Sequence, residues 1–163
     1  MFDRDLRDRA AALITQCRSA GLALATAESC TGGLVAALIT EIPGSSDVFE
    51  RGFVTYSNTA KIESLGVAPI LLEACGAVSP EVAIAMAAGA LAHSRADIAV
   101  SITGIAGPGG GSAEKPVGLV HFAYGRKDRE IIAVERRFGD LGRDGVRLAS
   151  LALALELLHK AAA

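Results

Sequence analysis

Apolar residues recur every three or four positions in the first part of the chain and predict an amphipathic helix. The positions that carry this periodicity are Leu6, Ala10, Leu13, Ile14 and Cys17. Gly21 follows them, and glycine is the residue type that most often ends a helix. Similar patterns with capping signals predict helices from Thr31 to Pro43-Gly44, from Asn58 to Leu65, from Pro80 to His93 and from Arg143 onward.

Short apolar runs between these helices predict strands, which we expect at 22–25, 51–56, 98–103, 117–124 and 131–138. The charged turn Arg126-Lys127-Asp128 joins the last two strands, and so short a connection favours an antiparallel hairpin. The alternation of strands with helices is typical of α/β proteins. We therefore expect a single domain, residues 1–163, with a three-layer α/β/α fold around a mixed parallel and antiparallel sheet.

Composition narrows the class of protein. The chain has 163 residues, 51% of them hydrophobic, which suits one domain with its own core. A net charge of −2 and a pI of about 5.9 argue against a nucleic-acid partner, which would need a basic patch. The charged start does not resemble a signal peptide, and the longest apolar run, Val82 to Ala92, is shorter than the ~18 residues of a membrane span. We expect no membrane partner and a cytoplasmic protein.

The cysteines and histidines show no metal-binding pattern. Cys17, Cys30 and Cys75 lie far apart without a C-x-x-C pair, which is typical of free thiols in a reducing compartment. The three histidines are equally scattered. We therefore expect no structural zinc.

The segment from Thr26 to Gly33 joins a predicted strand to a predicted helix. Its serine, Ser29, would lie at a helix N-terminus, where unpaired N–H groups and the helix dipole favour negative charge. A nucleophilic serine and a developing oxyanion both need such a setting. The alternative is that Ser29 or Thr31 only caps the helix. The segment is not the G-x-S-x-G motif of esterases, because Ala27 and Thr31 occupy the glycine positions.

A nucleophilic serine needs a base, and no histidine has a comparable setting. Tyr56 ends a predicted strand, and Lys61 lies on the first turn of the next helix. Serine–lysine pairs are known variants of the catalytic triad, provided that burial or a nearby cation lowers the pKa of the lysine. The alternative is an ordinary solvated helix lysine.

Two further segments are candidates for anion binding. The glycine-rich stretch from Gly104 to Gly118 follows a predicted strand. Successive N–H groups in such a loop can form a phosphate-binding nest. The alternative is a flexible surface loop. It matches neither the Walker loop nor the dinucleotide fingerprint. Arg143 and Arg147 are four residues apart on a predicted helix and could together hold a phosphate, or could lie on a solvated helix start.

Together these segments resemble the CinA C-terminal domain family, the nicotinamide-nucleotide amidases, over nearly the whole chain. Each matching motif is weak alone, and the five in this order are specific. They are Ala27 to Gly33, Pro43 to Ser46, Phe53 to Lys61, Gly76 to Ser79, and Thr103 to Gly110 with Lys115 to Gly118. Relative to the commonest family pattern, Leu141-Gly142 is inserted before Arg143. The chain begins directly at the amidase-like domain and so resembles the stand-alone form.

The resemblance implies hydrolysis of nicotinamide mononucleotide to nicotinate mononucleotide and ammonia in pyridine nucleotide salvage. It implies Ser29 as nucleophile, Lys61 as base and Tyr56 as the group that positions or relays the proton, with no metal or organic cofactor. The residues expected to hold the oxyanion are Thr31, Gly32 and Gly33. Those expected to hold the substrate phosphate are Thr103, Gly104, Gly107, Gly109, Gly110 and Arg143.

The expected partner is thus a small-molecule substrate. A non-catalytic nucleotide-binding or interaction module linked to competence or DNA damage is the alternative, and an amidase for a different small amide is a third. A small, alanine-rich, apolar domain could also form a homo-oligomer, although nothing in the sequence fixes an interface.

Overall fold

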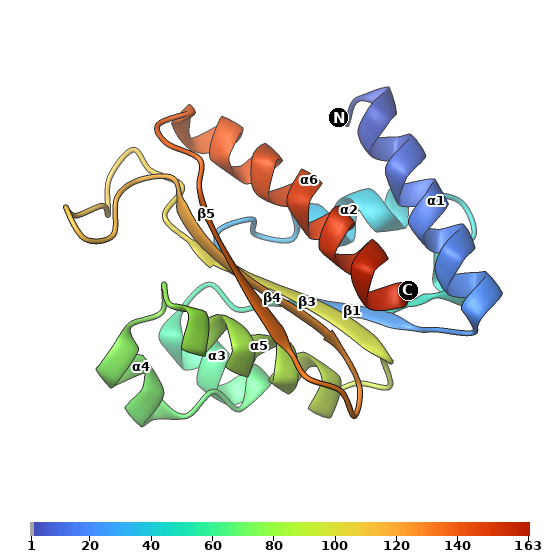
Figure 1. The fold of residues 1–163 in the computed structure, drawn as a ribbon, viewed down its shortest axis with the longest axis horizontal. Helices are drawn as coiled ribbons and strands as arrows, with labels where there is room; N and C mark the ends of the chain where they lie inside the picture. The colour runs from blue at the N-terminus through green and yellow to red at the C-terminus, as the bar shows by residue number, and fades with distance from the viewer. Residues whose placement is uncertain (1) are drawn as a thin grey trace.

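The computed structural model describes residues 2–163 and contains a five-stranded sheet between two layers of helices (Figure 1). The strands are β1 (Leu24–Glu28), β2 (Phe49–Val54), β3 (Ile98–Gly104), β4 (Leu119–Arg126) and β5 (Ile132–Arg137). Their order is β2-β1-β3-β4-β5. The first three strands are parallel to one another, whereas β4 and β5 run antiparallel to their neighbours. The expected single-domain α/β fold with a mixed sheet is confirmed.

Two groups of helices cover the two faces of the sheet. One face carries α1 (Arg4–Ala20), α2 (Leu34–Glu41) and α6 (Gly142–Ala162), and the other carries α3 (Asn58–Leu65), α4 (Pro69–Cys75) and α5 (Pro80–Ala92) (Figure 1). Residues 45–47 form a short 3-10 turn before β2. No helix within residues 2–163 is long and apolar enough to cross a membrane.

Capping residues explain where several helices begin and end. Ser79 accepts a hydrogen bond from the Val82 N–H, and Pro80 occupies the first turn of α5, as the sequence predicted. The Ser57 side chain accepts a hydrogen bond from the Ala60 N–H and so caps α3, the helix that carries Lys61. Gly21 ends α1 in the left-handed conformation.

Two boundaries differ from the predictions in a way that matters for the site. β1 was expected at 22–25 but extends to Glu28, so that Ser29 directly follows a buried strand. The next helix was expected from Thr31 but begins at Leu34, because Gly32 (φ 61°) and Gly33 (φ 96°) adopt left-handed conformations that keep the chain in a turn. Helix α4 was not predicted. It begins with Pro69, and only Leu72 is buried.

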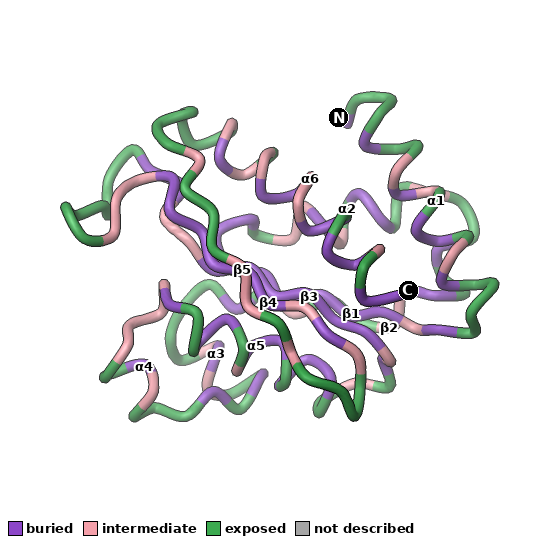
Figure 2. The backbone as a smooth tube through the Cα atoms, in the orientation of Figure 1, coloured by how far each residue is buried: buried purple, intermediate pink, exposed green. Residues whose placement is uncertain are grey.

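The centre of the sheet is the most buried part of the molecule (Figure 2). Every residue of β1 is buried, while the edge strands β2 and β5 are largely exposed or half-buried. The carboxyl ends of β1, β2 and β3 lie at the same end of the sheet because these strands are parallel. Ligands of open α/β sheets bind at that end.

Candidate active site

A cavity of about 280 Å³ opens beyond the carboxyl ends of the parallel strands. Nine of the expected site residues line it, from four separate parts of the chain. They are Ser29, Tyr56, Lys61, Thr103, Gly104, Gly107, Gly109, Gly110 and Arg143. The remaining expected residues, Thr31, Gly32 and Gly33, do not line it.

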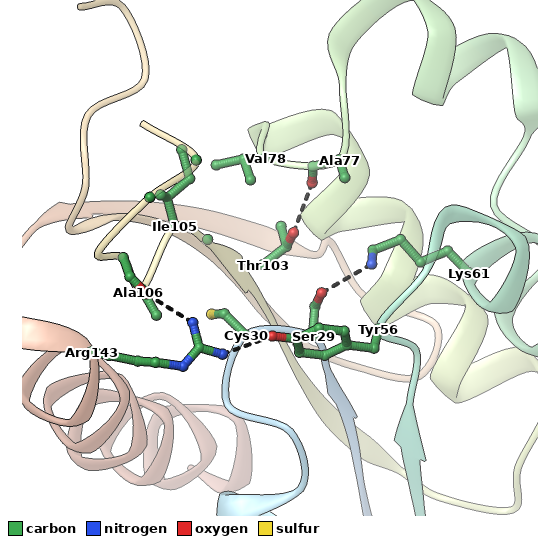
Figure 3. A pocket seen from close by; sticks show the side chains of 14 residues that line it. Ser29, Cys30, Tyr56, Lys61, Ala77, Val78, Thr103, Ile105, Ala106 and Arg143 are labelled. Atoms are coloured by element: carbon green, nitrogen blue, oxygen red, sulfur yellow. Dashed lines mark hydrogen bonds between the residues drawn. The ribbon is translucent and has the colours of Figure 1, made fainter. Parts of the chain in front are cut away.

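Ser29 and Lys61 meet inside the cavity. Lys61 Nζ lies 3.0 Å from Ser29 Oγ and donates a second hydrogen bond, of 2.6 Å, to the Thr55 carbonyl (Figure 3). Lys61 is only 1% exposed. Among residues 2–163, no carboxylate lies within salt-bridge distance of its amine. The contact therefore joins a hydroxyl to a buried amine that lacks a counter-charge.

Burial lowers the pKa of Lys61 from its ordinary value of 10.5, and attraction to Cys30 in its ionised form would oppose this effect in part. The physical cause is desolvation, because a charged amine loses more hydration on burial than a neutral one. Burial also raises the pKa of the Cys30 thiol to about 11. Cys30 therefore stays a neutral thiol beside Ser29, and Lys61 is the group whose charge is disfavoured.

Glu28 organises the turn that carries Ser29, a role that sequence reasoning missed. Its carboxylate is fully buried and accepts hydrogen bonds from the N–H groups of Gly33 (3.1 Å), Val35 (3.1 Å) and Ala36 (2.9 Å). It therefore satisfies the N-terminus of α2, where unpaired N–H groups attract negative charge. The available signal was an acidic residue at the end of a mostly apolar strand, shortly before a predicted helix start.

This arrangement corrects the expected source of the oxyanion donors. The Gly33 N–H donates to Glu28 and the Gly32 N–H donates to the Ser29 carbonyl, so neither is free. The N–H groups of Cys30 and Thr31 have no acceptor among residues 2–163. Of these two residues only Cys30 lines the cavity, while Thr31 is fully buried, so the donor that remains beside Ser29 lies earlier in the turn than the sequence indicated.

The glycine-rich loop forms the opposite side of the cavity. The N–H groups of Ala106, Gly107, Gly109 and Gly110 have no acceptor in the described part of the chain. Thr103 donates its hydroxyl hydrogen to the Ala77 carbonyl, at 2.8 Å, and so ties the end of β3 to the segment before α5. Free N–H groups gathered around a cavity suit an anionic ligand.

Tyr56 and Arg143 bond to each other rather than to Ser29 or Lys61. Arg143 donates hydrogen bonds to the Tyr56 hydroxyl oxygen (2.8 Å) and to the Gly107 carbonyl (2.9 Å) (Figure 3). Tyr56 is 60% exposed. The expectation that Tyr56 positions the proton of Lys61 therefore has no hydrogen bond to support it in residues 2–163.

Arg147 has a different place from the one expected. Instead of joining Arg143 around a phosphate, it donates hydrogen bonds to the carbonyl oxygens of Cys30 and Thr31 and does not line the cavity. As for metals, residues 2–163 contain no group of three His, Cys, Asp or Glu side chains arranged to hold an ion.

Comparison with known proteins gives consistent matches over almost the full chain. The model of the CinA C-terminal domain matches residues 6–162. Nicotinamide-nucleotide amidohydrolase PncC of Escherichia coli K12 is 51% identical over 97% of this chain and 95% of its own, and the protein of the same name from Enterobacter agglomerans is 48% identical over 96% and 94%.

A solved structure, the competence/damage inducible protein CihA from Agrobacterium tumefaciens, has a TM-score of 0.96. It is 53% identical to this chain, and the alignment covers 98% of this chain and 97% of that one. The match of the family model and these relatives agree with the order of motifs along the sequence. The chain belongs to the CinA C-terminal domain family.

Proposed function

We propose that this protein hydrolyses the carboxamide of nicotinamide mononucleotide to nicotinate mononucleotide and ammonia, in the cytoplasm. The observation that carries the proposal is the contact between Ser29 Oγ and the buried Lys61 amine. A neighbouring amine whose charged form is destabilised by burial can activate a hydroxyl as a nucleophile. The names of the relatives support the choice of substrate.

In the proposed reaction, Ser29 Oγ attacks the carboxamide carbon while the neutral Lys61 amine takes the hydroxyl proton. The tetrahedral intermediate collapses as Lys61 returns this proton to the leaving nitrogen, which departs as ammonia. A water molecule, deprotonated by Lys61, then attacks the acyl-enzyme; as the ester bond breaks, Lys61 returns the proton to Ser29 Oγ and the carboxylic acid is released. The first proton transfer uses two groups that already lie 3.0 Å apart.

The Thr55 carbonyl orients the base. A neutral amine has two N–H donors and one lone pair, and the 2.6 Å bond to Thr55 fixes one of the donors. The lone pair can then point at the Ser29 hydroxyl, 3.0 Å away on another side of the nitrogen. A charged ammonium could not accept the serine proton, so the lowered pKa of Lys61 is essential to this role.

The free N–H group of Cys30 is the proposed oxyanion donor. It belongs to the residue after the nucleophile, Cys30 lines the cavity, and no acceptor among residues 2–163 competes for this N–H. Backbone donors that are already fixed cost no reorganisation when charge develops.

The loop side of the cavity is proposed to hold the ribose phosphate. Its free N–H groups at 106, 107, 109 and 110 and the Arg143 guanidinium offer donors for an anion, and no Asp or Glu lines the cavity. The volume is close to the lower end of the roughly 300–1,000 Å³ typical of small-molecule sites. Tyr56 is assigned to hold Arg143 in place.

The test is ammonia release from nicotinamide mononucleotide, measured beside free nicotinamide and simple aliphatic amides. The wild-type protein should release ammonia from the mononucleotide. Ser29→Ala should lose several orders of magnitude in turnover, because a nucleophile acts as a unit with its base. Protection from thermal unfolding by the mononucleotide without any ammonia release would instead indicate a binding module. A Ser29→Ala variant that kept more than about a tenth of the activity would remove Ser29 as nucleophile.

A further inference from the structure

Arg147 on α6 holds the turn that carries Ser29 through two hydrogen bonds. Its Nε donates a hydrogen bond to the Cys30 carbonyl at 3.2 Å, and its Nη2 donates one to the Thr31 carbonyl at 3.0 Å. A guanidinium presents its donors in a rigid planar fork, so the two bonds hold both carbonyls at once. These carbonyls belong to the two residues that follow the proposed nucleophile.

The bond to the Cys30 carbonyl also fixes the plane of the peptide that follows Cys30. In a trans peptide the C=O and N–H groups lie in one plane, so a bond that holds the carbonyl holds the whole peptide unit. Helix α3, which carries Lys61, lies on the opposite face of the sheet from α6 (Figure 1). Arg147 therefore holds the turn from the side of α6, while Lys61 contacts Ser29 from the side of α3.

Within residues 2–163, nothing else holds this peptide. The Cys30 carbonyl accepts a hydrogen bond only from Arg147, and the Thr31 N–H has no acceptor. The residues that follow are Gly32 and Gly33, both in left-handed conformations, and glycine has the greatest backbone freedom. Loss of the Arg147 bonds would therefore allow the peptide to rotate.

The positive charge of Arg147 also favours attack by Ser29. No carboxylate lies within salt-bridge distance of its guanidinium in the described part of the chain. Its positive charge is therefore not neutralised by an ion pair, and it lies against the turn beside Ser29. A fixed positive charge next to the point where negative charge develops stabilises the transition state.

We propose that Arg147 is a positioning residue for the hydrolysis: it fixes the Cys30–Thr31 peptide and so holds the turn that presents Ser29 Oγ to Lys61 and to the substrate carbon. The proposal rests on the proposed function, because it assumes attack by Ser29. Arg147 does not line the cavity, so it should affect the rate of reaction rather than the binding of substrate.

The test compares kcat, KM and the pH profile of Arg147→Lys, Arg147→Met and Arg147→Ala with those of the wild type. A misplacement of about 1 Å can cost roughly 10²-fold in rate, so losses of about tenfold or more in kcat are expected, with KM within about twofold and an unchanged ionisation of the base. Lysine should not replace arginine, because it has no planar fork. Added guanidinium or methylguanidinium ions should restore part of the kcat of Arg147→Ala.

Arg51→Met is the matched control, because Arg51 donates to a backbone carbonyl, that of His93, at 2.8 Å and does not line the cavity. It should keep kcat within about twofold, as a lost surface hydrogen bond affects stability by only ~1 kcal/mol. Arg147 variants with the same small effect as this control would overturn the proposal. Loss of the folded state in all three Arg147 variants would also overturn it and indicate a structural role.

A second readout separates this proposal from the proposed function. A fluorophosphonate probe phosphonylates a nucleophilic serine, whose oxygen displaces fluoride from phosphorus. Its rate of reaction with Ser29 can be followed by mass spectrometry without any amide substrate. Slower labelling of Arg147→Met than of wild type supports the proposal even if nicotinamide mononucleotide proves not to be the substrate. Equal labelling rates would contradict it, and a wild-type protein that neither labels at Ser29 nor hydrolyses the mononucleotide would overturn both proposals.

Discussion

One side of the cavity carries Ser29 and Lys61, and the other is formed by the glycine-rich loop. The two sides differ in burial and in how many of their polar groups have hydrogen-bond partners. Lys61 is 1% exposed and its amine has partners on two sides. The loop side, in contrast, is partly open to solvent and keeps several N–H groups without partners in residues 2–163. Chemistry needs groups that are desolvated and fixed before the reaction, whereas binding needs donors that the ligand itself will satisfy.

The difference also follows from how each side is built. Ser29 directly follows a buried strand, and Lys61 lies on a helix with a side-chain cap. The backbone therefore fixes the positions of both residues. The loop side depends on Arg143, whose guanidinium bridges the Tyr56 hydroxyl and the Gly107 carbonyl. Substitutions on the first side should therefore lower kcat, and substitutions on the second should raise KM.

The largest expected effect is at Lys61. Lys61→Arg should be as damaging as Lys61→Ala, because arginine keeps its charge and cannot deprotonate. Loss of a general base costs roughly 10²–10⁴-fold. Steady-state ammonia release measures it, with the unfolding midpoint as the control for folding. If Lys61→Arg retained near-normal turnover, the base would have to be another group or a water.

A smaller effect is expected from Arg143. Arg143→Gln should raise KM for the mononucleotide, because hydrogen bonds to charged groups contribute about 1.5–3 kcal/mol. This corresponds to roughly tenfold to a hundredfold in kcat/KM. Free nicotinamide, which has no phosphate, should be a much poorer substrate than the mononucleotide, and its turnover should hardly change in this variant. An equal loss on both compounds would show that Arg143 does not act through the phosphate.

The smallest effect on turnover is expected from Glu28, which should act on stability. Both carboxylate oxygens of Glu28 accept hydrogen bonds from backbone N–H groups. In Glu28→Gln the side-chain NH₂ would replace one of these oxygens, and two donors would then face each other. The variant should therefore lose about 1–3 kcal/mol of unfolding free energy. Denaturant titration measures this. Asp3→Asn is the control, because within residues 2–163 the Asp3 carboxylate accepts only one N–H, that of Leu6, and an amide oxygen can accept it as well. Equal losses in the two variants would contradict the role given to Glu28.

The sequence predicted the fold well where periodicity and caps agreed, as at Ser79-Pro80 before α5. It placed the helix after Ser29 three residues too early, because Thr31 resembles a cap while Gly32 and Gly33 extend the turn instead. The short helix α4 was missed because it buries one side chain and so has little apolar periodicity.

The candidate site was predicted as a set of residues rather than as a geometry. Motif order brought together Ser29 and Lys61, which are 32 residues apart, but could not show which carbonyls each arginine contacts. Arg143 and Arg147 share a helix face as predicted, yet one contacts the loop and the other the nucleophile turn. Such pairings depend on the tertiary packing of α6, which no local pattern records.

The pH dependence of kcat tests the central claim, that a buried lysine is the base for Ser29, most directly. Because burial lowers the pKa of Lys61 below 10.5, the neutral amine should accumulate as the pH rises. The activity should therefore increase along a single ionisation below that of an ordinary lysine and level off above it. Lys61→Ala should lose this ionisation along with its activity. A wild-type profile that is flat, or that rises only near the ordinary pKa of lysine, would contradict the account.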